Sequence, residues 1–246
     1  MNLRGTTGLV TGGAVRIGRA ICEALAAEGC RVAVHYRGSA AEARSLVARL
    51  RGLGAEAWAV PGDLARESAC ERVVREAARR AGVRLDFLVN NAAVFHKHSL
   101  AGATRETVLR EFGANLLAPL SLTRAFAAQC RTEGRIVNLL DRRVAGVEAG
   151  CVPYLLSKKC LADLTRIAAL ELAPRIAVNG VAPGAVLPPP GKGADYLRDN
   201  AGRVPLERQV TPAEIAAAVV FLLKSDAITG QVLYVDGGQH LLGSVE

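Results

Sequence analysis

Aromatic residues make up only 4% of this 246-residue sequence, and methionine and tryptophan occur once each. The six cysteines form no Cys-x-x-Cys pair and do not cluster with the four histidines. Both a zinc site and a disulfide framework normally need such spacing, so we expect no bound metal and reduced, buried thiols.

Long apolar runs are also missing, because Arg, Glu, Asn or Gly interrupts every hydrophobic stretch. No segment has the length of a membrane span, and the first residues, MNLRGTTGLV, carry no apolar core of a signal peptide. We therefore expect a cytoplasmic protein. The formal charge of +8 is scattered and accompanies no stacking-aromatic motif, so we expect a basic cleft for a small anionic ligand rather than a nucleic-acid surface.

What the sequence does contain is an alternation of short β-branched runs with longer stretches of helical periodicity. The predicted strands cover residues 8–11, 31–36, 55–60, 86–90, 135–140, 176–181 and 231–235. The predicted helices lie near residues 17–28, 40–53, 66–81, 104–130, 153–173 and 212–224. This pattern predicts an α/β fold, a single domain over 1–246 with a doubly wound parallel sheet of about seven strands and helices on both faces.

Residues 184–204, GAVLPPPGKGADYLRDNAGRV, break this pattern because their prolines and glycines oppose a regular helix start. Two interpretations remain open for this segment. It is either a mobile flap that carries a substrate-specific loop over the site, or a plain connector.

The stretch TGGAVRIGRA, residues 11–20, joins the first predicted strand to the first predicted helix. Gly12 and Gly18 bracket a turn whose free backbone N–H groups and helix dipole would face a pyrophosphate. Alternatively, these glycines only permit a tight turn and close helix packing. Arg16 stands where such loops usually keep a glycine.

The end of the second strand, VHYRGSAAE, bears on the choice between two dinucleotides. An NAD-binding chain usually carries an acidic residue there, whereas the first carboxylate here is Glu42. Arg37 can instead bind a 2′-phosphate bidentately, which favours NADP(H). Ser39 would either add a phosphate contact or form a helix capping box with Glu42.

Polar residues also follow the third and fourth strands. Asp63 would accept a hydrogen bond from an adenine amino group, or it would cap the next helix. Asn90 and Asn91 suit clamping of the backbone beside a cofactor, and they equally suit an ordinary turn.

Tyr154 and Lys158 are four residues apart at the start of a predicted helix, and so share one helix face. A Lys ammonium near a phenol stabilises the phenolate. We therefore predict a phenol pKa below its ordinary value of about 10, and a Tyr154 that exchanges protons near neutral pH.

These motifs occur together in a known order. TG-x-x-x-x-I-G, NNA, Y-x-x-x-K and the PG that ends VAPG resemble the short-chain dehydrogenase/reductase family over nearly the whole chain. The resemblance implies a single Rossmann-type domain and hydride transfer from a nicotinamide, with Tyr154 as acid/base and Lys158 holding the nicotinamide ribose. It also implies that Asn115 supports a water-linked proton relay, although a buried hydrogen bond between helices is an alternative for Asn115.

Two departures from that family pattern resemble its pteridine reductase branch. Asp141 lies 13 positions before Tyr154, where the family usually has a serine, and Arg16 replaces a glycine of the phosphate loop. His35-Tyr36 followed by Ser39 matches the same branch. The resemblance implies that Asp141 moves a proton or holds the substrate, whereas the alternative is a surface salt bridge from Asp141 to Arg142 or Arg143.

The substrate side of the resemblance involves an aromatic ring. Phe95 falls where pteridine reductases sandwich a pterin against the nicotinamide, although simple core packing is an alternative. Arg16 would contact both the pyrophosphate and the pterin. Ala93 and Val186 stand where the branch often has serine. The threonine that usually binds the carboxamide after the PG is absent too, so a backbone group of Val186 or Leu187 would have to bind it.

The resemblance therefore implies an NADPH/NADP⁺-dependent reduction of a pterin, namely a 7,8-dihydropterin, an oxidised pterin or dihydrofolate, to the tetrahydro form by a homotetramer. The implied substrate-binding residues are Arg16, Phe95, Asp141 and Tyr154. The implied cofactor-binding residues are Gly12, Arg16, Ile17, Gly18, His35, Tyr36, Arg37, Ser39, Asp63, Leu64, Asn90, Asn91, Ala92, Tyr154, Lys158, Pro183, Gly184 and Val186. Two alternatives stay open: a keto reductase, such as a 3-oxoacyl carrier-protein reductase or an alcohol or sugar dehydrogenase, and a non-catalytic NADP(H)-binding sensor.

Overall fold

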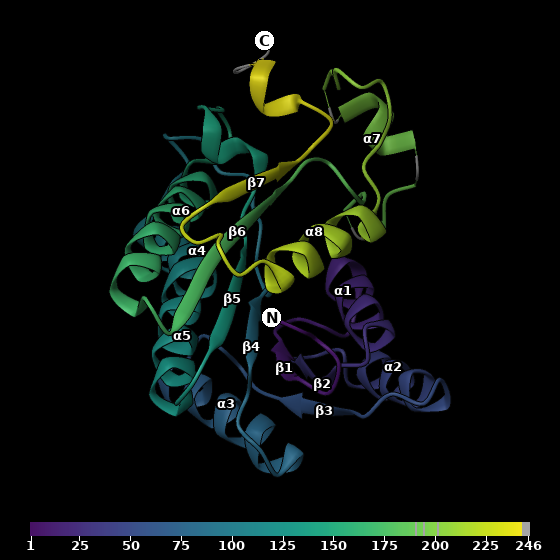
Figure 1. Cartoon of the computed structure of the whole chain (residues 1–246). Coiled ribbons are helices and arrows are strands. Elements are labelled where there is room, and N and C mark those ends of the chain that lie inside the picture. Colours follow the sequence, from purple (N-terminus) through teal and green to yellow (C-terminus); the bar gives the residue numbers. More distant parts are fainter. Residues whose placement is uncertain (190, 194, 201, 243–246) are drawn as a thin grey trace.

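The computed structural model describes residues 1–189, 191–193, 195–200 and 202–242, and Figure 1 shows a sheet flanked by helices. The strands are β1 (Thr7–Val10), β2 (Arg31–Tyr36), β3 (Ala57–Pro61), β4 (Phe87–Asn90), β5 (Gly134–Leu139), β6 (Ile176–Pro183) and β7 (Val232–Val235). The α-helices are α1 (Arg16–Ala27), α2 (Ala40–Gly52), α3 (Glu67–Ala81), α4 (Arg105–Phe112), α5 (Ala118–Gln129), α6 (Val152–Leu172), α7 (Asp195–Asn200) and α8 (Pro212–Lys224).

The strand order is β3-β2-β1-β4-β5-β6-β7, and every neighbouring pair is parallel. This order confirms the predicted Rossmann-type sheet. The chain winds outward from β1 in one direction and from β4 in the other, so a crevice opens between the carboxyl ends of these two strands.

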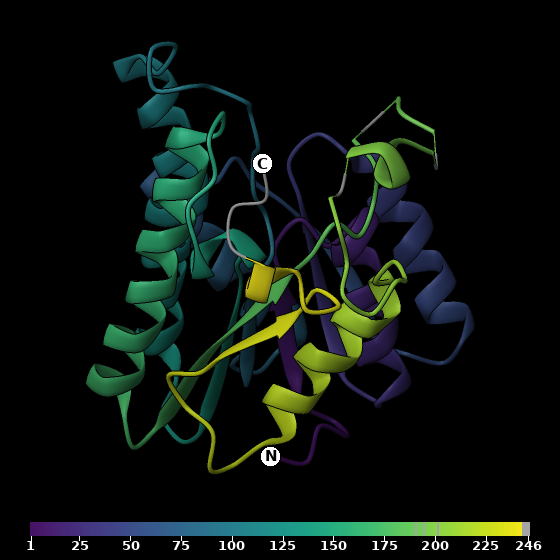
Figure 2. The ribbon, with the colours of Figure 1, turned by 90° about the horizontal axis from the view of Figure 1, so that it is seen from above.

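The helices form a layer on each face of the sheet, as the view from above shows (Figure 2). Alternate residues of a strand point to opposite faces, and so β1 serves two cores. Val10 packs with buried residues of α1, α2 and α8, whereas Leu9 packs with those of α3, α5 and α6. Burial on both faces explains the apolar strands that the sequence contains.

The helix predicted over 104–130 is wrong as a single element. The structure divides it into α4, a π-helical turn at Gly113–Leu117, and α5. Pro119 has no N–H to donate to the carbonyl of Asn115, four residues earlier, so a regular α-helix cannot continue through this point. The wider turn leaves the Asn115 side chain buried.

The segment 184–204 was expected to be irregular, and the structure corrects this expectation by placing α7 within it. Residues 190, 194 and 201 of the segment lie outside the described residues. The choice between flap and connector stays a prediction.

None of the described helices is both long enough and apolar enough to cross a membrane. Among the described residues, no group of three or more His, Cys, Asp or Glu side chains is arranged to hold a metal ion. The cysteines are free thiols, and all except Cys160 are buried.

We predict that Gly8→Ala lowers the free energy of unfolding by about 1–3 kcal/mol, because overpacking forces a core to shift. Gly8 of β1 pairs with Phe87 of β4, and a Cβ at Gly8 would lie 1.8 Å from the buried Phe87 ring. Urea unfolding measures this change.

Gly52→Ala is the matched control. A Cβ at Gly52 would meet no heavy atom of the described residues within 4 Å, so this variant keeps or slightly raises stability. A Gly8→Ala protein as stable as the wild type would contradict the packing argument.

Candidate active site

The turn between β1 and α1, residues 11–18, is here called the phosphate loop. Gly12 has a φ of 60°, a left-handed conformation that favours glycine. A Cβ at Gly18 would lie 2.2 Å from the Gly12 carbonyl oxygen. α1 begins beside Val15, which has no side-chain acceptor to cap it, so the N–H groups of its first turn suit an anion.

Asn91 supports this loop from the end of β4. Its Nδ2 donates to the carbonyl oxygens of Thr11 at 2.8 Å and Gly12 at 3.1 Å. Thr11 Oγ1 accepts in return from the backbone N–H groups of Asn91 and Ala92. The clamp predicted for Asn91 is therefore observed. Asn90 instead donates to Asn138 Oδ1 of β5, inside the sheet.

His35 holds the same loop from β2. Its Nδ1 accepts from the Gly12 N–H at 3.1 Å, which leaves Nε2 to donate to the Gly62 carbonyl at 3.1 Å. Burial lowers the pKa of His35 to about 4, so the imidazole is neutral near pH 7. His35 thus ties the phosphate loop, through Nδ1, to the residue that follows β3, through Nε2.

A cleft of about 500 Å³ extends from the phosphate loop across the ends of β2, β3 and β4. It brings together many of the predicted cofactor residues, which are Gly12, Arg16, Ile17, Gly18, His35, Tyr36, Arg37, Ser39, Asp63, Leu64, Asn91 and Ala92. Ala14, Val15, Gly38, Ala65, Ala93, Val94 and Ala114 also line it and were not predicted. Most of these are small residues that leave room for a ligand, a property with no motif of its own.

Two capping alternatives from the sequence are wrong. Ser39 lies at the N-cap of α2, but its side chain makes no capping hydrogen bond among the described residues. Arg66, not Asp63, lies at the N-cap of α3. Asp63 Oδ1 accepts instead from the Ala65 N–H at 3.3 Å. Both side chains border the cleft.

Arg16 occupies a strained backbone position. Its φ of 55° lies in the left-handed region, which costs a non-glycine residue roughly 1–2 kcal/mol. Its guanidinium donates to the Leu187 carbonyl at 3.3 Å. Arg16 therefore links the phosphate loop to the segment after β6, and such strain is often found at functional sites.

Three side chains meet where β5 ends and α6 begins. Tyr154 Oη donates to Asp141 Oδ2 at 2.8 Å, and Arg143 Nη1 lies 3.1 Å from the same oxygen. Asp141 also accepts from the Arg143 N–H, and Glu148 pairs with the Arg143 guanidinium. The salt bridge considered for Asp141 is present, but it is combined with a contact to the phenol.

The predicted lowering of the Tyr154 pKa is wrong for this arrangement. Burial, followed by the charge of Asp141, raises the pKa of Tyr154 well above its ordinary value. Lys158 Nζ donates to the Leu139 carbonyl at 2.7 Å, and burial lowers the pKa of Lys158 to about 8. Tyr154 is therefore a protonated donor next to a carboxylate.

Phe95 is 43% exposed, so core packing does not explain it. Its ring meets the Tyr154 ring edge-on, with centroids 4.6 Å apart, and the Arg143 guanidinium lies 5.8 Å from its centroid. Phe95 thus presents an aromatic surface directly beside the Tyr154–Asp141 pair.

Asn115 is buried in the π-helical turn, where its side chain makes the hydrogen bond considered as an alternative. Nδ2 donates to Val94 O and Glu111 Oε2 and lies 3.1 Å from Ser157 Oγ, and Oδ1 accepts from the Val94 N–H. A proton relay through Asn115 stays a prediction.

Pro183, Gly184 and Val186, at the end of β6 and just after it, do not line this cleft. Pro183 ends β6, and a Cβ at Gly184 would lie 2.8 Å from Gln239 Oε1. Val186 is buried, and its carbonyl accepts from Gln209 Nε2 at 2.7 Å. The carbonyls of Val186 and Leu187 are thus already engaged.

The sequence interpretation missed the contributions of Glu111 and His96 to this region. It considered Arg143 only as a surface partner of Asp141, and did not predict that the Arg143 guanidinium also faces the Phe95 ring. Glu111 and His96 pair at 2.8 Å across 15 residues. No motif connects residues at that separation.

Three relatives resemble this chain over most of their length. Pteridine reductase 1 of Leishmania tarentolae is 36% identical, covering 95% of this chain and 96% of the relative. Granaticin polyketide synthase putative ketoacyl reductase 2 of Streptomyces violaceoruber is 34% identical, covering 95% and 96%. The crystal structure of FolM alternative dihydrofolate reductase 1 from Brucella canis, complexed with NADP, has a TM-score of 0.92 at 34% identity and covers 98% of this chain and 96% of that chain.

A family model described as enoyl-(acyl carrier protein) reductase matches residues 13–240. This match includes α1, the rest of the sheet beyond β1, and the Tyr154–Lys158 helix. The Rossmann-type sheet, the phosphate loop and the Tyr-Lys pair agree with it. The chain belongs to the short-chain dehydrogenase/reductase family.

Proposed function

We propose that this protein is an NADPH-dependent pterin reductase that converts a 7,8-dihydropterin to its tetrahydro form. The observation that carries the proposal is the Asp141 carboxylate 2.8 Å from the Tyr154 hydroxyl, beside the exposed Phe95 ring. Likeness to pteridine reductase 1 and to an alternative dihydrofolate reductase supports it.

The cleft residues fit NADP(H). Only a residue without a Cβ fits at position 18 of the phosphate loop. The free N–H groups at the N-terminus of α1 would bind the pyrophosphate. Arg37 and Ser39 border the cleft at the end of β2 and would hold the 2′-phosphate. Lys158 would contact the nicotinamide ribose. When bound, NADPH supplies the hydride.

Reduction of a ring C=N bond also requires a proton on the nitrogen. Tyr154 would donate it, because its raised pKa keeps the phenol protonated until the hydride arrives. Asp141 would orient that hydroxyl and hold the aminopyrimidine edge, while Arg143 offsets the carboxylate charge. A serine in place of Asp141 would instead suit polarisation of a ketone.

Phe95 and Arg16 would orient the substrate. Stacking on the Phe95 face is worth about 0.5–1.5 kcal/mol beyond area burial, enough to favour one ring orientation. Arg16 would reach the pyrophosphate and the pterin edge from the phosphate loop. Its bond to the Leu187 carbonyl, which directs the guanidinium from the phosphate loop toward the segment after β6, supports this role.

A keto reductase is the second candidate, and the likeness to a putative ketoacyl reductase favours it. We predict that the purified protein oxidises NADPH with 7,8-dihydrobiopterin at least about tenfold more efficiently, in kcat/KM, than with an acetoacetyl thioester. NADPH absorbance measures both rates. Turnover of the thioester alone would refute the pterin proposal.

We predict that Arg37→Glu reduces the preference for NADPH over NADH by more than about tenfold, because a carboxylate repels the 2′-phosphate. The ratio of kcat/KM for the two cofactors measures this preference. Arg44→Glu, on the exposed side of α2, is the control and should leave the ratio unchanged. Unchanged selectivity in Arg37→Glu would remove Arg37 from the cofactor site.

We predict that Asp141→Ser lowers kcat for dihydrobiopterin by about 100-fold, since groups that support proton transfer typically contribute 10²–10⁴-fold. Single-turnover kinetics at saturating NADPH measure the chemical step. Binding of NADPH, followed by fluorescence, is the control and should stay within about twofold of the wild type. Full pterin activity in this variant would show that the carboxylate is dispensable.

A further inference from the structure

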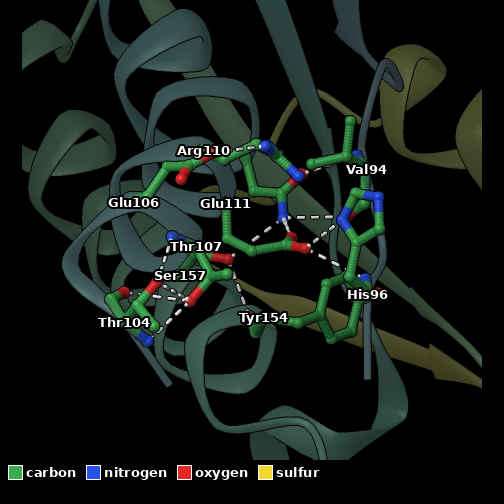
Figure 3. Close-up of polar contacts among 10 residues, drawn as sticks. Val94, His96, Thr104, Glu106, Thr107, Arg110, Glu111, Tyr154 and Ser157 are labelled. Carbon is green, nitrogen blue, oxygen red and sulfur yellow. Dashed lines mark hydrogen bonds and ion pairs between the residues drawn. The ribbon is translucent and has the colours of Figure 1, made fainter. Parts of the chain in front are cut away.

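Glu111 is a buried acid that the proposed proton transfer does not use. It lies near the end of α4, and only 1% of its side chain is exposed. Figure 3 shows its carboxylate directed at His96, which belongs to the segment after β4. Oε1 accepts from the His96 N–H at 2.9 Å and lies 2.8 Å from His96 Nδ1.

Glu111 and Asn115 hold the same short segment on either side of Phe95. Asn115 Oδ1 accepts from the Val94 N–H at 2.9 Å, and its Nδ2 donates to the Val94 carbonyl at 3.0 Å. Glu111 holds His96 through its backbone and its ring. The backbone of Phe95 is therefore fixed at the residue before it and at the residue after it.

The two clamping side chains are joined to each other and to the helix that carries Tyr154. Asn115 Nδ2 donates to Glu111 Oε2 at 2.8 Å and lies 3.1 Å from Ser157 Oγ. Ser157 Oγ donates to the Tyr154 carbonyl at 2.7 Å. One hydrogen-bonded network thus connects the supports of both Phe95 and Tyr154, whose rings are in contact.

Stability alone does not explain a carboxylate at this place. Burying a carboxylate costs free energy unless the carboxylate is paired and hydrogen-bonded, so stability by itself would favour an apolar side chain here. The α4 surface offers a contrast, since Glu106 pairs with Arg110 at 2.7 Å in solvent, where such pairs contribute little. Glu111 differs from Glu106 because its carboxylate accepts a hydrogen bond from a backbone N–H, that of His96.

We propose that Glu111, through His96, is a positioning residue that sets the Phe95 ring for a flat nitrogen heterocycle and thereby tunes substrate affinity. The proposal rests on the pterin reductase function. Glu111 touches neither the substrate nor the cofactor in this scheme, and acts through the backbone of residues 94–96. A rigidly held ring loses less conformational freedom when a substrate stacks on it.

The test compares Glu111→Gln with Glu106→Gln, which changes the same functional group on the exposed face of the same helix. The carboxylate of Glu111 accepts hydrogen bonds from His96 with one oxygen and from Asn115 with the other. The glutamine amide has only one oxygen, so it cannot accept both. We expect Glu111→Gln to raise the KM for 7,8-dihydrobiopterin about tenfold while kcat and the KM for NADPH stay within about threefold. Glu106→Gln should match the wild type.

A merely structural role for Glu111 would lower the folded fraction, and so reduce kcat without moving KM. That result, or an unchanged KM in Glu111→Gln, overturns the proposal. If Glu111→Gln does not fold, His96→Gln decides the question, since His96 is 45% exposed and its ring is the outer half of the pair. An unchanged dihydrobiopterin KM in His96→Gln also overturns it.

Amide hydrogen exchange separates this proposal from the proposed function. The His96 N–H should exchange at least about tenfold faster in Glu111→Gln than in Glu106→Gln. Its hydrogen bond to Glu111 protects it from exchange, and the substitution weakens that bond. A wild type that turns over no dihydropterin refutes the function. In that case the positioning role of Glu111 is judged by amide hydrogen exchange alone, and an unchanged exchange rate of the His96 N–H refutes it.

Discussion

A carboxylate held 2.8 Å from a buried phenol constrains everything around it. Taking the phenol out of water and placing it beside a negative charge both favour its protonated form. Arg143 is needed because an unpaired carboxylate at this depth would be costly. Lys158, turned toward the Leu139 carbonyl, has a lowered pKa for the same reason of burial. The site thus keeps the Tyr154 phenol protonated.

The sheet makes this arrangement available. In a parallel sheet with this order, the carboxyl ends of the strands converge on one edge. Residues after β1, β2 and β4 line the cleft, whereas Asp141 and Tyr154, which share a hydrogen bond, both follow β5. Arg16 crosses from the first group to the segment after β6, at the cost of a left-handed backbone. The phosphate loop and the segment after β6 are therefore joined by a side chain as well as by the fold.

Local patterns were sufficient for the sheet, the phosphate loop and the Asn91 clamp, since each depends on residue type within a short span. The π-helical turn was missed because helical periodicity continues through it, and only Pro119 marks the break. The Tyr154 pKa was misjudged because helix spacing places Lys158 nearby but does not reveal burial or the bond to Asp141. The Glu111–His96 pair depends on tertiary contact and leaves no sequence signature.

The imidazole beneath the phosphate loop has a consequence for acid tolerance. Burial keeps the His35 ring neutral, and a proton on Nδ1 would also remove the bond from Gly12. The pKa of His35 is therefore about 4 in the folded chain, whereas an unfolded histidine accepts a proton near 6.5. Its contribution to folding is complete above pH 6.5 and declines as pH falls from there toward 4. Acidification therefore acts on the fold through the same ring that shapes the dinucleotide seat.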